Sequence, residues 1–322
     1  MKFKWKTIGN QKAVEYLDKS LSNNQIANFY IFSGPNDVGK FSLAKDFITN
    51  IFLNDLPDLI IKDNFLETNG DFSIIEREAN KKNISINQIR DFISRFRSGS
   101  FMNSYRAAII KEGQYLNDSS ANALLKILEE ADNKTIIILT VNDVDSLPKT
   151  IVSRGQIINL FSVSNDLIYQ NLVDKHLVNK SLAKNLSRLS DGRPGLALKF
   201  LENESLYNDY QSLVFDFLDF LPLIFSERLK IIDRIMKKNE VLENFNILQI
   251  WQSVVRDLIF VNYEQYDYVR NDFALERLKS FKADSLDALS LNDKASVISM
   301  AESYQSSNIN LRSVLEYIAI NV

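Results

Sequence analysis

Three short apolar runs, separated by longer stretches with helical spacing, mark the first half of the chain. They are Asn28–Phe32, Ala107–Ile110 and Thr135–Leu139, and each has the length of a strand that is buried on both faces. The stretch between the last two runs has a helical period and an N-cap at Asn117 or Asp118. Alternating buried strands and helices predict an α/β domain built on a parallel sheet.

The second half of the chain has a different pattern. All nine glycines lie at or before Gly195, and only Pro222 of the five prolines lies beyond it. Apolar residues recur there at helical spacing, which is typical of an all-α region. Three shorter helices precede it, and they are expected at residues 165–176, 181–189 and 194–201. We therefore expect three domains, namely an α/β domain, a small three-helix lid and a helical C-terminal domain, at residues 1–161, 162–205 and 206–322.

The first apolar run leads directly into a glycine-rich segment and then into a helix. Strand, GxxxxGK and helix form the context of a phosphate-binding loop, in which backbone N–H groups and the lysine hold phosphate oxygens. The candidate nucleotide-binding residues are Gly34, Pro35, Asn36, Asp37, Val38, Gly39, Lys40 and Phe41. ATP or ADP as a structural ligand is therefore left open.

Both positions that would hold Mg²⁺ in such a site carry unsuitable residues. A Ser or Thr should follow the lysine as a metal ligand, but Phe41 stands there, and Ser42 points about 100° away on a helix. The second strand should end in Asp-Glu, but it ends in Lys111 and Glu112. Glu112 keeps the position of the catalytic base, whereas Lys111 would repel the metal ion. We expect no metal site and no ATP hydrolysis by this chain alone.

Several segments together resemble the clamp-loader branch of the AAA+ ATPases. ANALLKILEE at residues 121–130 is similar to that branch's NALLKxLEEP helix, and FYIFSGPNDVGK is similar to its phosphate loop. Ser153-Arg154-Gly155 resembles its SRC arginine-finger motif, with Gly in place of Cys. The resemblance covers essentially the whole chain. It implies an AAA+ P-loop domain, a helical lid and an all-α collar domain through which subunits assemble.

The resemblance also implies roles for single residues. Arg154 corresponds to a finger that acts in trans on the ATP of a neighbouring subunit, and such fingers contribute about 10³ to 10⁵ in rate. Thr140 and Asn142 match the segment called sensor 1. Gly195 stands where hydrolysing relatives carry the sensor 2 arginine, so this element is also altered.

The function implied is that of a subunit of the bacterial DNA polymerase III clamp loader, which places the sliding clamp on primed DNA. The changed metal site favours a rigid, non-hydrolysing subunit that presents Arg154 to a motor subunit. The alternative is an ATP-hydrolysing gamma/tau-type motor of the same complex. The partners implied are the gamma/tau and delta subunits of a hetero-pentamer, with the clamp and primed DNA reached through the complex.

Composition excludes several other classes of site. With no cysteine, the chain cannot hold the four-Cys zinc module that often occupies the segment at residues 51–83 in the family, and this segment is expected to be polar and irregular. A net charge of −3 argues against a chain that wraps DNA by itself. Without a bilayer-length apolar run or a signal peptide, a cytoplasmic protein with no membrane partner and no required cofactor is expected.

Overall fold

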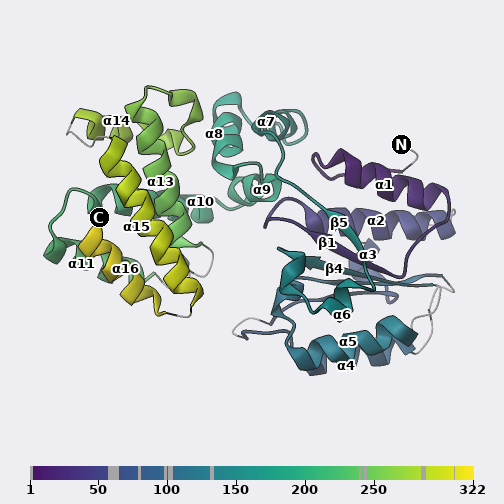
Figure 1. Ribbon diagram of the computed structural model, residues 1–322. Helices are drawn as coiled ribbons and strands as arrows, with labels where there is room; N and C mark the ends of the chain where they lie inside the picture. Colours follow the sequence, from purple (N-terminus) through teal and green to yellow (C-terminus); the bar gives the residue numbers. More distant parts are fainter. Residues whose placement is uncertain are drawn as a thin grey trace. The chain divides into compact units, whose positions relative to one another are not determined.

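The chain packs as two compact units, which are described separately below (Figure 1). The first unit is Met1–Leu167 with Gly192–Gly195, and the second is Ile168–Asp191 with Leu196–Val322. The expected three-domain boundaries remain a prediction. The computed structural model describes residues 3–56, 65–78, 81–97, 100, 104–130, 134–238, 241–242, 245–283, 288–307 and 309–322.

A five-stranded sheet forms the centre of the first unit. Every pair of neighbouring strands is parallel, and the strand order is β2-β3-β4-β1-β5. The strands are β1 (Phe29–Ser33), β2 (Phe72–Ile75), β3 (Arg106–Ile110), β4 (Thr135–Val141) and β5 (Gln156–Asn159). The α/β architecture with a parallel sheet is therefore confirmed.

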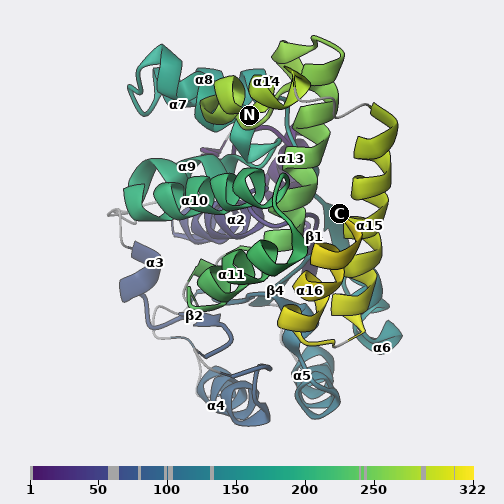
Figure 2. The ribbon, with the colours of Figure 1, turned by 90° about the vertical axis from the view of Figure 1, so that its left-hand side faces the viewer.

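Helices cover both faces of this sheet, as a parallel sheet requires (Figures 1 and 2). Along β1, Tyr30 and Phe32 point into the core with α1 and α2, whereas Phe29 and Ile31 point into the core with α4 and α5. The helices of this unit are α1 (Gln11–Ser22), α2 (Lys40–Asp55), α3 (Phe65–Thr68), α4 (Ile86–Arg97), α5 (Asp118–Glu130) and α6 (Lys149–Val152), with short 3₁₀ turns at Gly113–Tyr115 and Val144–Ser146.

The expectation of an irregular segment at residues 51–83 is wrong in its described part. It contains the end of α2, the short helix α3 and the edge strand β2. The four residues of β2 lie among polar neighbours and Ile74 is 38 % exposed, so no apolar run marks the strand. Pairing with β3 defines it instead. After this segment, Ile84 forms one isolated parallel bridge with Leu116.

The second unit is helical throughout its described part, apart from turns and short 3₁₀ segments. Its centre is an aromatic cluster in which the Trp251 ring lies 4.7 Å from Phe217 and 5.1 Å from Phe220. Its helices are α7 (Asn165–Asp174), α8 (Lys180–Ser190), α9 (Pro194–Glu202), α10 (Glu204–Phe220), α11 (Phe225–Met236), α13 (Ile247–Asn262), α14 (Leu275–Ala283), α15 (Ala288–Ser306) and α16 (Leu311–Asn321), of which α7 and α9 begin in the first unit. None of the described helices is long and apolar enough to cross a membrane.

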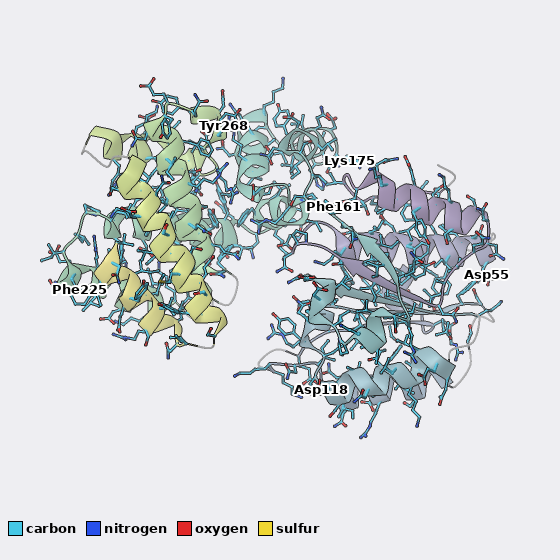
Figure 3. All side chains as sticks on the ribbon, in the orientation of Figure 1. Asp55, Asp118, Phe161, Lys175, Phe225 and Tyr268 are labelled. Atoms are coloured by element: carbon cyan, nitrogen blue, oxygen red, sulfur yellow. The ribbon has the colours of Figure 1, made fainter. Side chains whose placement is uncertain are left out.

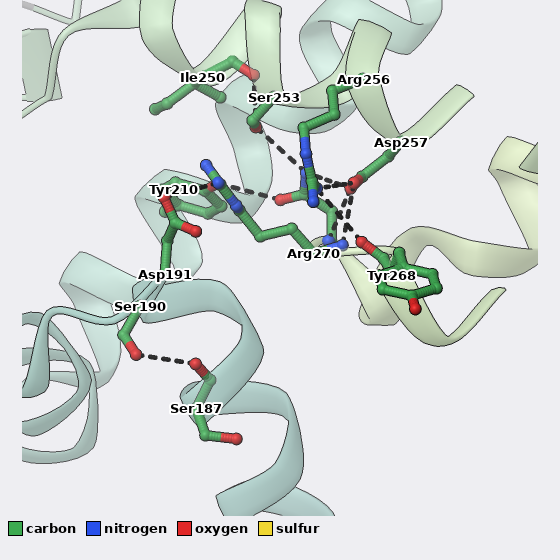
Figure 4. Close-up of polar contacts among 11 residues, drawn as sticks. Ser187, Ser190, Asp191, Tyr210, Ile250, Ser253, Arg256, Asp257, Tyr268 and Arg270 are labelled. Carbon is green, nitrogen blue, oxygen red and sulfur yellow. Dashed lines mark hydrogen bonds and ion pairs between the residues drawn. The ribbon is translucent and has the colours of Figure 1, made fainter. Parts of the chain in front are cut away.

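A buried carboxylate organises the polar interior of this second unit (Figure 4). Asp257 of α13 is fully buried, and its oxygens accept hydrogen bonds from the backbone N–H groups of Arg270 and Asn271, at 2.9 and 2.7 Å. The Asn271 amide also donates to Asp257, at 2.8 Å, and its oxygen accepts from the Tyr210 hydroxyl, at 3.0 Å. Burial raises the pKa of Asp257, so these donors are needed to hold the charged form.

Ion pairs connect the same region to helix α8. Arg188 of α8 contacts Asp267 and Asp272, at 3.0 and 3.3 Å, and Arg270 contacts Asp191 at the end of α8, at 2.6 Å. The Asp257 network thereby fixes one loop, residues 266–274, against three helices of this unit, α8, α10 and α13.

We predict that Asp257→Ala destabilises the second unit by about 3 kcal/mol, because it leaves three buried N–H donors without their acceptor. Urea unfolding followed through Trp251 fluorescence measures this, in a Trp5→Phe background that leaves Trp251 as the single tryptophan. The matched control is Asp219→Asn, which removes an exposed pair with Arg277 of 2.6 Å and should change stability by less than about 1 kcal/mol. Equal effects of the two variants would contradict the assigned role of Asp257.

Candidate functional site

The predicted phosphate loop after β1 contains residues with a left-handed backbone. It runs from Gly34 through the left-handed residues Asp37 (φ 62°) and Gly39 (φ 102°), and α2 begins at Lys40. A non-glycine residue with positive φ is uncommon, and at Asp37 it also places a carboxylate in a loop of anion-binding type. One residue of the predicted phosphate loop therefore carries a charge that opposes anions.

The Lys40 ammonium is held by the chain itself. It donates hydrogen bonds to the backbone oxygens of Gly34 and Pro35, the latter at 2.8 Å, and to Asn142 Oδ1 at 3.1 Å. Asn142 directly follows β4, so the parallel register of β1 and β4 brings these two predicted residues together. Burial lowers the pKa of Lys40 to about 8, although the Asp37 and Glu112 carboxylates act in the opposite direction.

Thr140, the other predicted sensor residue, makes its hydrogen bonds to the end of β3. It is buried in β4, where its hydroxyl accepts a hydrogen bond from the Glu112 N–H, at 3.1 Å, and lies 3.5 Å from the Ile110 oxygen. Thr140 therefore ties the end of β3 to β4. Glu112 has a left-handed backbone (φ 55°), and the half-buried residue turns the chain sharply after β3.

The two residues that are predicted to stand at the metal positions contact each other. The Lys111 ammonium lies 4.2 Å from the centre of the Phe41 ring, within the range of a cation–π contact. The same ammonium pairs with Glu76 Oε2, at 2.6 Å. The Lys111 ammonium, paired with the Glu76 carboxylate, therefore lies beside the Phe41 ring, at the position where a metal ligand was expected.

These residues do not fit a magnesium ion. Mg²⁺ needs oxygen ligands, and Phe41 offers none, while Lys111 adds positive charge at the neighbouring position. In the described part of the chain, no group of three or more His, Asp or Glu residues could hold a metal.

Gly195 lies directly against the phosphate loop. Its N–H donates to the Asp37 backbone oxygen, at 2.8 Å, and a Cβ built on it would stand 2.9 Å from that oxygen. A side chain here would collide with the loop backbone. Gly195 therefore lets the loop close at the position where the resemblance places a sensor arginine.

Arg154 lies at the surface, on the turn between α6 and β5. Its guanidinium pairs with Glu129 Oε1 of α5, at 2.6 Å, and donates to the Thr150 oxygen, at 3.0 Å, while the side chain stays 40 % exposed. The next residue, Gly155, packs under β1, and a Cβ there would come within 2.6 Å of Ile31. Helix α5, which carries Glu129, begins at Asp118 (labelled in Figure 3). The Asn117 side chain caps this helix by accepting a hydrogen bond from the Ser120 N–H, at 2.9 Å.

The sequence patterns did not point to Glu76 or Glu129, and they included Asp37 only as a candidate nucleotide-binding residue. Glu76 lies in the segment that was expected to be irregular, and Glu129 is far from Arg154 along the chain. Asp37 falls at a variable position of the GxxxxGK pattern. The phosphate loop of the resembling family, SGPxGxGK, has a glycine where Asp37 stands, which could have suggested a positive φ at this position. No local pattern in the sequence points to the pairing of Glu76 with Lys111 or of Glu129 with Arg154.

Comparison with known proteins finds similar subunits of DNA polymerase III. Residues 9–164 match the family described as "DNA polymerase III, delta subunit". The chain is 25% identical to DNA polymerase III subunit gamma/tau of Mycoplasma genitalium over 292 residues, which are 85% of this chain and 48% of that protein. It is 31% identical to subunit delta' of Haemophilus influenzae over 123 residues, 38% of each chain.

The fold has a counterpart among solved structures. A gamma subunit-related protein of DNA polymerase III from Thermotoga maritima superposes with a TM-score of 0.50 at 16% identity, covering 94% of this chain and 97% of that one. The chain spans about half or less of the length of the curated relatives named above. The chain is therefore similar, over residues 9–164, to the family described above and, over parts of its length, to curated subunits of DNA polymerase III. It shares its fold with the Thermotoga maritima protein.

Proposed function

We propose that this chain is a non-hydrolysing, delta-prime-like subunit of a bacterial DNA polymerase III clamp loader. In this role it presents Arg154 to the ATP site of a neighbouring motor subunit. The single observation that carries the proposal is the contact of Lys111 with Phe41, at 4.2 Å, because it puts a cation and a ring where Mg²⁺ and its ligand would be needed.

The remaining contacts of the loop support the same conclusion. Lys40 already has three oxygen partners within the chain, and Asp37 places a negative charge among the backbone groups that would face phosphates. A phosphate would have to displace the bonds to Gly34, Pro35 and Asn142 and would also meet repulsion from Asp37. ATP or ADP therefore remains at most a structural ligand, and no cofactor or zinc is required for the proposed role.

The exposed position of Arg154 suits a residue that acts outside its own subunit. Charge develops on the γ-phosphate oxygens during phosphoryl transfer, and a guanidinium placed against them stabilises that charge. Arg154 follows the short helix α6, which is anchored through the fully buried Ile151. The surface turn therefore has a rigid base beneath an accessible guanidinium.

A second candidate function is that of an ATP-hydrolysing gamma/tau-type motor subunit. It is favoured by the names of several relatives, among them the Mycoplasma genitalium gamma/tau subunit, which aligns with 85% of this chain. Phe41 and Lys111 count against it, because a motor needs both metal positions. The expected effects of Arg154 substitution below distinguish the two functions.

The proposed partners are the gamma/tau and delta subunits in a hetero-pentamer, with the sliding clamp and primed DNA engaged through the assembled complex in the cytoplasm. The helical second unit, as the proposed collar, offers exposed apolar side chains to such partners. Phe225 and Tyr268, labelled in Figure 3, are 46% and 60% exposed. Buried aromatic residues such as Phe217 serve the core instead.

We predict no steady-state ATP hydrolysis by the isolated chain. In the complex reconstituted with its motor subunits, clamp and primed DNA, Arg154→Ala should lower the ATPase rate at the adjacent site by about 10³-fold. Arg77→Ala, which changes another arginine of the same unit, is the control and should leave the rate unchanged. Mg²⁺-dependent hydrolysis by the isolated chain would instead identify a motor subunit.

The lowered pKa of Lys40 gives a separate prediction. The side-chain NMR signal of Lys40, identified by its loss in Lys40→Met, should titrate near pH 8. Because the folded pKa lies below the ordinary value of 10.5, the folded unit binds fewer protons than the unfolded chain between pH 8 and pH 10.5. Stability relative to Lys40→Met should therefore rise across that range. A midpoint at the ordinary value would show that Lys40 is not held in this loop.

A further inference from the structure

We propose that Glu129 is a positioning residue for Arg154, which holds the guanidinium in the direction needed for its action on a neighbouring subunit. This inference rests on the proposed function of Arg154 and adds to it a residue that lies 25 positions earlier in the chain. Neither the phosphate loop nor the metal positions take part in it.

The geometry fixes the guanidinium at two points. Glu129 Oε1 lies 2.6 Å from Nη2 of Arg154, and the Thr150 oxygen accepts from Nη1 at 3.0 Å. These contacts occupy two of the five N–H donors of an arginine, which leaves the others for phosphate oxygens. Arg154 can therefore act while its pair with Glu129 is kept.

The position of Glu129 on its helix is electrostatically unfavourable without such a partner. Helix α5 ends in Glu129 and Glu130, and its last turn contains no basic residue. The carboxyl end of a helix carries partial negative charge, so two carboxylates there repel it. The guanidinium of Arg154 compensates one of them, which explains why an acidic residue at this site is compatible with the fold.

Helix α5, which carries Glu129, and helix α6, which precedes Arg154, pack in the same core. Ile127 of α5 and Ile151 of α6 belong to the same buried core cluster beneath the sheet. Only the two side chains at the surface, with Glu129 56% and Arg154 40% exposed, are left to adjust. Without Glu129, the long arginine side chain would spread over more rotamers before a neighbour docks.

The test is a double-mutant cycle in the reconstituted complex, with ATPase rate as the readout. Glu129→Gln keeps the shape and removes the charge, and it should lower the rate about two- to five-fold, as expected for an exposed pair. In an Arg154→Ala background it should cause no further loss, because it acts only through Arg154. Glu130→Gln is the matched control for net charge and helix-end charge and should leave the rate unchanged.

The outcomes separate this inference from the proposed function. If Arg154→Ala lowers the rate but Glu129→Gln leaves it unchanged or raises it, the positioning role is overturned and the finger remains. An equal loss in both backgrounds also overturns it, since Glu129 would then act independently of Arg154. If Arg154→Ala has no effect, the proposed function itself fails. Unfolding of the isolated chain should be the same for Glu129→Gln and wild type, which excludes a merely structural effect.

Discussion

The parallel register of β1, β3 and β4 is the constraint on which the rest of the first unit depends. Because parallel strands end at the same edge of a sheet, this register gathers residues from distant parts of the sequence. The loop after β1 supplies Lys40, the end of β3 supplies Lys111, and the end of β4 supplies Asn142. Sheet pairing and buried apolar side chains hold these positions, so the substitutions at the edge change the chemistry without disturbing the fold.

The charges at this edge are balanced within the chain. Lys111 pairs with Glu76 and lies on the Phe41 ring, and Lys40 is bound by backbone oxygens and Asn142. Both ammonium groups thus have their polar partners within the chain, as buried and half-buried polar groups usually do. Arg154 is satisfied differently, since its partner Glu129 is exposed and the pair contributes little to stability. Of these three cations, Arg154 is exposed at the surface, whereas Lys40 and Lys111 contact groups of their own site.

Much of the fold could be predicted from sequence because its signals are local. Buried strands such as β4 are continuous apolar runs, and α5 has both a cap at Asn117 and a helical period. The edge strand β2 was not predicted, because a short, half-exposed strand has no such apolar run. The identity of the changed positions, Phe41 and Lys111, followed from motif spacing, but their mutual contact did not. Pairing of Glu129 with Arg154 depends on tertiary packing that the sequence does not encode locally.

A structure of the assembled complex with a non-hydrolysable ATP analogue tests the central claim most directly. The account predicts that the Arg154 guanidinium lies about 2.7–2.9 Å from a γ-phosphate oxygen of the neighbouring subunit's nucleotide. It also predicts that Lys111 remains against Phe41, with no Mg²⁺-nucleotide in the loop of this chain. Arg154 far from any nucleotide, or a magnesium-bound ATP analogue beside Lys40, would contradict the account.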